Sequence, residues 1–213
     1  MFDLSKLILI APAFLLAITI HEFSHGYIAY RLGDPTAMNA GRLTFNPLKH
    51  LDVFGTLALL FIGFGWAKPV PVDPRNFADP RRDNLWVALA GPVSNFLSAL
   101  AFGLLFRITE PLLGNNNIGQ VFLMMIFFGV WINLILTIFN LLPIPPLDGF
   151  HILEGLVSYE NYIRLQQFAR VGPMILLGLI LLSSFTGFHF FAIVFGPFVR
   201  FFGTIFTGQS FGY

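Results

Sequence analysis

The 213-residue chain contains no cysteine and few charged residues. Asp, Glu, Lys and Arg make up 11% of the sequence, whereas a soluble domain carries about 25%. The lack of cysteine excludes a disulfide scaffold and any cysteine-ligated zinc or iron–sulfur site. The scarcity of charge leaves too little to cover a soluble surface. The apolar content of 56% also excludes intrinsic disorder.

The charges that are present nearly cancel. Twelve basic and eleven acidic residues give a formal net charge of +1, which excludes a strongly basic nucleic-acid-binding surface. The N-terminus lacks the positive region and cleavage site of a secretory signal. No polar stretch is long enough for an appended soluble domain. We therefore expect residues 1–213 to form a single integral-membrane domain.

Five apolar runs are candidates for membrane spans, because a spanning helix needs about 20 mostly apolar residues. They are Leu7–Tyr30, Leu85–Phe106, Ile118–Leu142, Val171–Phe185 and Phe188–Phe206. The last two are either two spans or one broken hairpin. A sixth run, Val53–Trp66, has only 14 residues and three glycines, which suits a re-entrant or interfacial segment. The sequence predicts an all-α polytopic membrane protein with about five transmembrane helices and a re-entrant or short β segment near residues 53–75.

The basic residues predict the orientation of these spans. Seven of the twelve lie between Arg31 and Asn84, whereas the connection at residues 107–119 contains only Arg107. The connection at residues 143–170 contains two more. Cytoplasmic loops carry an excess of Lys and Arg. We therefore expect the first and third connections to be cytoplasmic and the N-terminus to lie outside.

Three ionisable residues interrupt the first span as His21-Glu22-x-x-His25. Ionisable groups inside a span cost several kcal/mol and are candidates for function. Residues four apart share one helix face about 6 Å apart, so the two imidazoles can bind one zinc ion. Glu22 can then accept a proton from metal-bound water. The alternative is a chance match, which this composition produces in about 0.2% of such chains.

A catalytic zinc ion takes three protein ligands and leaves one position open, so a third donor is required. The candidates are Asp148, His151, His50, His189 and Glu110. Depth favours Asp148. The paired histidines lie about 8–15 Å inside the cytoplasmic boundary at 1.5 Å per residue, and the stretch that ends at Asp148 approaches the same boundary. Alternatively, Asp148 caps a helix that starts at Gly149, and His151 lies beside the ligands or at the surface.

Three prolines (Pro143, Pro145 and Pro146) precede Asp148 and prevent a regular helix there. Irregular backbone at membrane depth is tolerated only where it is buried in protein or faces a water-filled cavity. We therefore expect this segment to line a wet pocket, with Gly149 permitting tight backbone geometry. We expect His50 to be an interfacial or hydrogen-bonding histidine. Asn95 either bonds another helix or orients a ligand or substrate.

At these residues the sequence resembles the site-2 protease family of intramembrane zinc metalloproteases. Two motifs carry the resemblance: His21-Glu22-x-x-His25, and Asn140-x-x-Pro143-x-x-x-Leu147-Asp148-Gly149. Three weaker stretches agree with it, at residues 41–50, 67–72 and 90–95. The resemblance covers about residues 5–155, and the C-terminal membrane segments at about 170–206 add no motif. It is to a minimal form, without the PDZ or CBS domains of larger members.

The resemblance implies a three-helix core that holds one zinc ion through His21, His25 and Asp148, with Glu22 as catalytic base. It implies that Asn140 helps to stabilise the transition state. The activity implied is hydrolysis of peptide bonds in transmembrane substrate proteins within or near the bilayer, as in regulated intramembrane proteolysis. Residues 66–72 match a segment that pairs with an unwound substrate, and the prolines in Pro69–Val72 suit an edge strand.

Two other functions use the same residues. A metal or proton transporter also places His, Glu and Asp inside the membrane, but its charges are expected along several spans rather than at one depth. A catalytically silent relative that acts as a chaperone is expected to have a broken motif, and this motif is complete. We expect a multi-pass protein of the cell membrane, located in a prokaryotic inner membrane, with its active site toward the cytoplasm.

Overall fold

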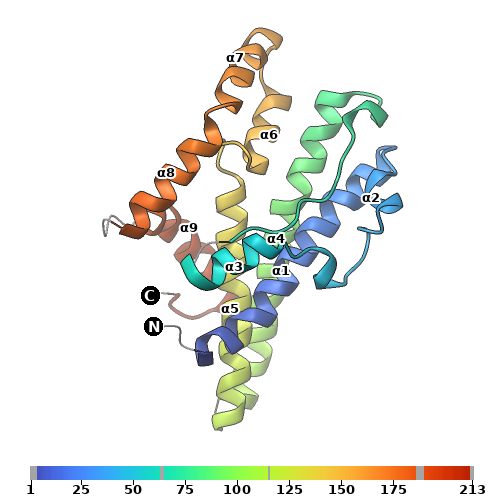
Figure 1. Ribbon diagram of the computed structural model, residues 1–213. Helices are drawn as coiled ribbons and strands as arrows, with labels where there is room; N and C mark the ends of the chain where they lie inside the picture. Colours follow the sequence, from blue (N-terminus) through green and yellow to red (C-terminus); the bar gives the residue numbers. More distant parts are fainter. Residues whose placement is uncertain (1–3, 63–64, 115, 186–189, 212–213) are drawn as a thin grey trace.

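The computed structural model describes residues 4–62, 65–114, 116–185 and 190–211. The α-helices are α1 (Leu4–Arg31), α2 (Thr36–Asn39), α3 (Val53–Ile62), α4 (Pro80–Leu113), α5 (Asn117–Asn140), α6 (Asp148–Leu156), α7 (Tyr159–Ala169), α8 (Gly172–Phe185) and α9 (Phe190–Thr207). Two short 3-10 turns, η1 (Pro47–Lys49) and η2 (Pro74–Asn76), lie between them. The described residues form no named strand, which confirms the all-α prediction (Figure 1).

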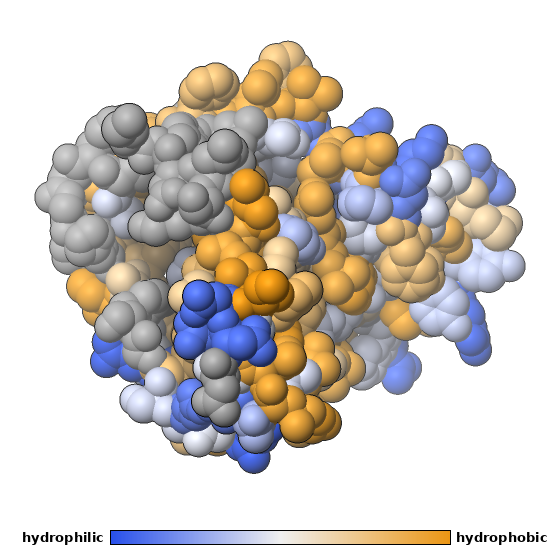
Figure 2. All heavy atoms as spheres, turned by 90° about the horizontal axis from the view of Figure 1, so that it is seen from below, coloured by the Kyte–Doolittle hydropathy of each residue, from blue (hydrophilic) through white to orange (hydrophobic). Residues whose placement is uncertain are grey.

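Four helices are long and apolar enough to cross a membrane: α1, α4, α5 and α9. Helices α7 and α8 form a pair bent by 55°, which is either a broken span, the fifth, or a re-entrant loop. By length and composition, the described residues therefore supply four to five spans, as predicted, and the protein is a multi-pass membrane protein. Hydrophobic residues cover much of the surface seen in Figure 2, as expected of a chain whose outer surface contacts lipid.

The long helices extend beyond their apolar runs because polar caps determine where they begin. Asp79 accepts a hydrogen bond from the Arg82 amide, and Pro80 occupies the first turn of α4, where its missing N–H costs nothing. Asn116 caps α5 through the Gly119 amide. Helix α4 therefore has 34 residues, about 50 Å at 1.5 Å per residue. It is longer than the predicted Leu85–Phe106 span and extends past the hydrocarbon core.

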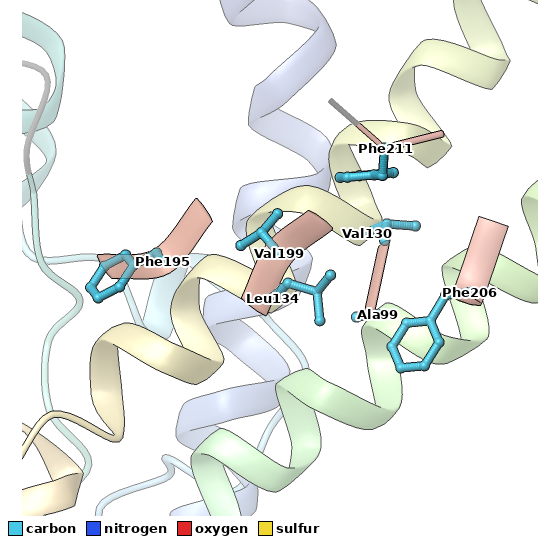
Figure 3. Close-up of a cluster of buried hydrophobic side chains, with 7 residues drawn as sticks. All are labelled: Ala99, Val130, Leu134, Phe195, Val199, Phe206 and Phe211. Atoms are coloured by element: carbon cyan, nitrogen blue, oxygen red, sulfur yellow. The ribbon is translucent and has the colours of Figure 1, made fainter. Parts of the chain in front are cut away.

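Helices α4, α5 and α9 share the main buried core. Ala99 of α4 and Val130 and Leu134 of α5 are fully buried and meet the side chains of α9 (Figure 3). Helix α1 packs against α5 through a second cluster that includes Ala17 and Ile132. Helices α1, α4 and α5 therefore form the packed frame on which the polar residues of the first span are mounted.

The segment predicted as re-entrant or β contains a short helix and an isolated β-bridge. Helix α3 runs across the direction of the long helices (Figure 1) and has 10 residues, too few to span a bilayer. Its Phe54 side chain is exposed. The segments before and after α3 are joined by an antiparallel bridge between Leu51 and Ala67, and the Lys68 amide donates to the His50 carbonyl over 2.8 Å. Residues 68–73 then continue without helix.

The connection predicted at residues 143–170 contains two helices, α6 and α7. Helix α6 lies close to the alternative helix that starts at Gly149, whereas α7 was not predicted. Arg81 at the start of α4 holds the end of α6, where its guanidinium donates to the carbonyls of Glu154 (2.8 Å) and Val157 (2.6 Å). It also lies 5.0 Å from the centre of the Tyr162 ring in α7. Both helices are amphipathic rather than uniformly apolar, which is why a search for apolar runs passes over them.

Candidate metal centre

Side chains from two helices distant in the sequence converge at one point. His21 and His25 lie one turn apart on α1, and Asp148 is the first residue of α6. The His21 Nε2 atom lies 3.0 Å from the His25 Nε2 atom and 3.2 Å from Asp148 Oδ2. The His25 Nε2 atom lies 3.3 Å from Asp148 Oδ1. Within the described part of the chain, these three residues form the group of His, Asp or Glu side chains able to hold a metal ion.

The other nitrogen of each imidazole determines what Nε2 can do. His25 Nδ1 lies 2.7 Å from the Val87 carbonyl, which only accepts, so Nδ1 carries the hydrogen. His21 Nδ1 lies 2.6 Å from Asn95 Oδ1, which also only accepts. In the neutral rings both Nε2 atoms therefore present lone pairs, and these face each other across 3.0 Å. Such an arrangement favours a cation between them.

Asp148 adds a carboxylate to the same point. Its Oδ2 atom is buried and has no hydrogen-bond partner, although a buried carboxylate oxygen is costly unless it is paired or binds a metal. Helix α6 begins at Asp148, with Leu147 at the N-cap position and no side-chain cap, so the N-cap alternative is wrong. Two imidazole nitrogens and a carboxylate form a donor set that fits Zn²⁺.

Helix α4 forms the surface on which both imidazole rings lie. A Cβ atom at Gly91 would be 2.4 Å from His25 Nε2 and 2.5 Å from His21 Cε1, so only glycine leaves room for the rings. Pro92, the next residue, is buried inside α4. The rings are thus held between the acceptors Val87 and Asn95 on either side of a glycine. The stretch at residues 90–95, one of the weaker matches to the site-2 protease family, therefore contains residues that hold the two histidines.

The proline-rich segment brings Asp148 to this surface. Residues 141–147 contain no helix, as three prolines require. A Cβ atom at Gly149 would be 2.3 Å from the Leu141 carbonyl oxygen, which confirms the tight backbone predicted at Gly149. The chain therefore folds back on itself immediately before the carboxylate, and Asp148 reaches the two histidines from the end of α5.

Glu22 lies on α1 between the two histidines and contacts the extended segment. Its Oε2 atom accepts a hydrogen bond of 2.9 Å from the Val70 amide. Arg42 holds the same segment through the carbonyls of Lys68 (2.7 Å) and Pro69 (3.1 Å). Burial lowers the pKa of the Arg42 guanidinium, and the Glu22 carboxylate partly opposes this shift. The position of Glu22 is therefore coupled to a backbone segment that a buried arginine holds.

The far end of this segment is held by a second buried charge. Asp34 is fully buried, and its Oδ2 atom accepts from the Asp73 amide over 2.8 Å. Its Oδ1 atom accepts from Asn76 (2.7 Å) and from the Thr36 amide (3.1 Å). Burial raises the pKa of Asp34, but the hydrogen bond from the Thr36 hydroxyl, together with those from the Asp73 amide, Asn76 and the Thr36 amide, outweighs it and the pKa is lowered. Residues 68–73 are thus held at both ends by side chains of the loop after α1.

A cavity of about 680 Å³ opens beside the three convergent side chains. Glu22 and Asn140 line it together with His21, His25 and Asp148. The rest of the wall is mostly apolar and comes from α1, the extended segment, the end of α5 and α8, through residues such as Ile18, Val70, Val72, Phe139, Leu176 and Ile180. The amide nitrogen of Asn140 donates one hydrogen bond, to Leu136 O over 3.0 Å.

The other histidine candidates lie elsewhere. His50 is fully buried and bonds the Thr44 carbonyl through Nε2 at 2.8 Å, so it holds the loop before α3 and is not among the residues that line the cavity. His151 lines the cavity, and its Nδ1 atom lies 2.7 Å from Glu154. His189 lies outside the described residues.

Glu110 belongs to the last turn of α4, and it is not part of the convergent group. Sequence reasoning left the role of Asn95 open, and the structure places Asn95 against His21. Gly91, Arg42 and Asp34 were missed. Gly91 and Arg42 lie in the weakly matching stretches 90–95 and 41–50, which assigned them no role, and Asp34 is a charge close to the first span.

Comparison with known proteins identifies a family and several relatives. Residues 9–183 match the family described as "Peptidase family M50". The chain is 42% identical over 184 residues to "Putative zinc metalloprotease YwhC" of Bacillus subtilis (strain 168), covering 83% of this chain and 81% of that protein. It is 31% identical over 193 residues to "Putative zinc metalloprotease Rip2" of Mycobacterium tuberculosis (strain H37Rv), covering 88% and 72%. No solved structure matches the chain.

Proposed function

The chain belongs to peptidase family M50, a family of membrane zinc proteases, and we propose that it is an intramembrane zinc metalloprotease. Its reaction is hydrolysis of peptide bonds of transmembrane substrate proteins within or near the bilayer, in regulated intramembrane proteolysis. One observation carries the proposal. His21, His25 and Asp148 converge beside a cavity that Glu22 also lines. Three potential metal ligands and the carboxylate of a potential base therefore face one cavity.

We assign one zinc ion to His21, His25 and Asp148. When bound there, zinc supplies Lewis-acid polarisation of the scissile carbonyl and a lowered pKa for the attacking water. The protein holds the donors ready for it. Both histidines are oriented by acceptors at Nδ1, and Asp148 Oδ2 is buried without a hydrogen-bond partner.

Glu22 serves as the general base. The Val70 amide holds its Oε2 atom, which orients the carboxylate, and Oε1 is the oxygen that we assign to the proton. Glu22 takes this proton from the attacking water and passes it to the nitrogen of the leaving amine. The Val70 hydrogen bond restricts rotation of the carboxylate, so little reorientation is needed between the two transfers.

Asn140 is the donor that we assign to the carbonyl oxygen of the scissile bond. An asparagine amide has two N–H groups. One is used on the Leu136 carbonyl, and this bond holds the amide in place at the wall of the cavity. The second can donate to the oxygen as negative charge develops on it, which is the arrangement that stabilises such transition states.

The substrate is a transmembrane helix that must unwind before cleavage, because its carbonyls are already hydrogen-bonded. Residues Pro69–Val72 offer replacement hydrogen bonds by strand addition. Prolines have no N–H, and the Val70 N–H is used by Glu22. The Val70 carbonyl and the backbone groups of Val72 therefore remain for pairing, on the edge that faces Glu22. The apolar wall of the cavity suits the side chains of such a segment.

The protein is proposed to lie in the cell membrane, with the site toward the cytoplasm. The positive-inside rule supports this orientation, since seven of the twelve basic residues lie between Arg31, the last residue of α1, and Asn84, near the start of α4. The loop between α1 and α4 also contains Arg42 and the extended segment, so the polar residues that hold Glu22 lie on the same side as the excess of positive charge.

Cleavage of a helical membrane substrate by the purified, reconstituted protein tests the proposal. We expect cleavage to stop when a chelator removes zinc and to resume when zinc is restored. The Glu22→Gln variant should keep zinc and lose cleavage. Zinc flux into proteoliposomes without proteolysis would instead establish a transporter. Cleavage by the Glu22→Gln variant at the wild-type rate would remove Glu22 from the role of base.

A further inference from the structure

Two fully buried asparagines lie behind the metal centre. Asn95 of α4 and Asn133 of α5 are both 0% exposed. A buried amide is costly unless its donors and acceptor are satisfied, and the cost is greatest where no water can reach it. Asn133 lies seven residues, or about two turns, before Asn140 on α5. Neither the sequence motifs nor the proposed mechanism assigns a role to Asn133.

Backbone carbonyls determine the direction of every hydrogen bond in this pair. The Gly129 carbonyl can only accept, so the Asn133 group 2.8 Å from it is the amide nitrogen. Asn133 Oδ1 therefore faces Asn95, and it accepts from Asn95 Nδ2 over 2.9 Å. The Ala17 carbonyl of α1, 3.1 Å from the same Nδ2 atom, requires the same orientation of the Asn95 amide.

The direction continues to the metal ligand. Because Asn95 Nδ2 faces Asn133 and Ala17, Asn95 Oδ1 faces His21 Nδ1 at 2.6 Å. An amide oxygen only accepts, so His21 Nδ1 carries the hydrogen and His21 Nε2 keeps its lone pair. The orientation of the two amides does not depend on a choice between similar N and O atoms, because two carbonyls define it independently.

We propose that Asn133 and Asn95 form an amide relay that orients His21 as a zinc ligand. Asn133 is the positioning residue: it holds the Asn95 amide with its oxygen toward His21, and it is itself held by the Gly129 carbonyl. This inference rests on the proposed zinc site. A carboxylate in place of Asn133 would lack the N–H for Gly129 and would place two oxygens against each other, so the relay requires amides.

The test measures the zinc dissociation constant of the full chain by competition with a chelator. Asn133→Leu removes the relay and keeps the approximate volume. Thr137→Val is the matched control: Thr137 is buried one turn further along α5, and its hydroxyl bonds the Pro92 and Asn133 carbonyls. We expect Asn133→Leu to raise the dissociation constant by about 10-fold or more, the range for groups that orient metal ligands, and Thr137→Val to leave it within about 2-fold of wild type.

Equal effects of the two substitutions would overturn the proposal, because they would show only a loss of packing at the α4–α5 interface. The Co²⁺-substituted protein adds a spectroscopic readout. We expect its visible absorption bands to change in the Asn133→Leu variant and to be retained in the Thr137→Val variant, since only the first releases His21.

A second measurement needs no variant of Asn133. In the metal-free wild-type chain, ¹⁵N NMR of labelled histidine should show neutral His21 protonated at Nδ1, with the signal identified by its loss in His21→Gln. Protonation at Nε2 would overturn the relay. If the wild-type chain binds no zinc, the proposed function fails. The tautomer of His21 in the metal-free chain still shows whether the two asparagines orient its ring.

Discussion

Gly91→Ala tests whether the surface of α4 positions the metal ligands. The added Cβ atom would be 2.4 Å from His25 Nε2, 2.5 Å from His21 Cε1 and 2.6 Å from His25 Cε1. Ordinary contacts between such atoms begin near 3.4 Å. The rings or the helix must therefore move by about 1 Å, in an interior that is close-packed.

The displacement acts on metal binding more than on folding. His25 cannot rotate away without losing its 2.7 Å hydrogen bond to Val87, which belongs to the same helix as the new methyl group. A misplacement of about 1 Å costs about 100-fold in a reaction that depends on geometry. Alanine also favours a helix over glycine by about 1 kcal/mol. We therefore expect a folded protein that cleaves substrate about 100-fold more slowly and binds zinc about 10- to 100-fold more weakly, the range for metal ligands that lose their orientation.

The assay compares zinc affinity, substrate cleavage and thermal unfolding of the metal-free protein. Gly178→Ala in α8 is the matched control, because a Cβ atom at Gly178 meets nothing within 4 Å. We expect Gly178→Ala to leave zinc affinity and cleavage unchanged. Wild-type zinc affinity in the Gly91→Ala variant would refute the reasoning, since it would show that the rings do not depend on the absence of a side chain at residue 91.

Three further predictions address the surroundings of the site. Arg42→Met leaves the Lys68 and Pro69 carbonyls without their donor, so the free energy of unfolding should fall by about 2–3 kcal/mol. The rate of cleavage should also fall, while zinc affinity, measured by chelator competition, stays unchanged. Cleavage at the wild-type rate would show that Arg42 does not position Glu22. Asp34→Asn places an N–H against the donors around residue 34 and should cost about 1–3 kcal/mol at pH 7. Because the pKa of Asp34 is lowered, the ionised Asp34 side chain stabilises the fold fully above about pH 4, and this stabilisation is lost as the pH falls through the folded-state pKa. The difference in free energy of unfolding between the wild type and Asp34→Asn should therefore become smaller at acid pH. A difference that does not change with pH would contradict the assignment. The chain has no cysteine, so an impermeant maleimide should label Arg75→Cys only from the cytoplasmic side and Asn117→Cys only from the opposite side; the reverse pattern would invert the proposed topology.

Local patterns allowed much of the fold to be predicted. Long apolar runs indicated α1, α4, α5 and α9, because a bilayer imposes a minimum length of apolar helix. Helix α7 was missed and α6 was considered only as an alternative, since half-polar helices carry no such requirement. The ends of α4 were also missed, because Asp79 and Pro80 determine where the helix begins, and not the hydropathy of its middle.

The composition and the spacing of a few residues determined by themselves that this is a membrane protein with a histidine pair inside its first span. Helical periodicity places residues i and i+4 together whatever the remainder of the chain does. Depth favoured Asp148 as their partner, and the resemblance to a known family implied it. Only the tertiary structure decided what holds these groups. The partners of Gly91, Arg42 and Asn133 are distant in the sequence: they are the imidazole rings, the Lys68 carbonyl and the Asn95 amide, respectively. Neither the type of these three residues nor their immediate neighbours in the sequence indicate such partners, because only tertiary packing brings them together.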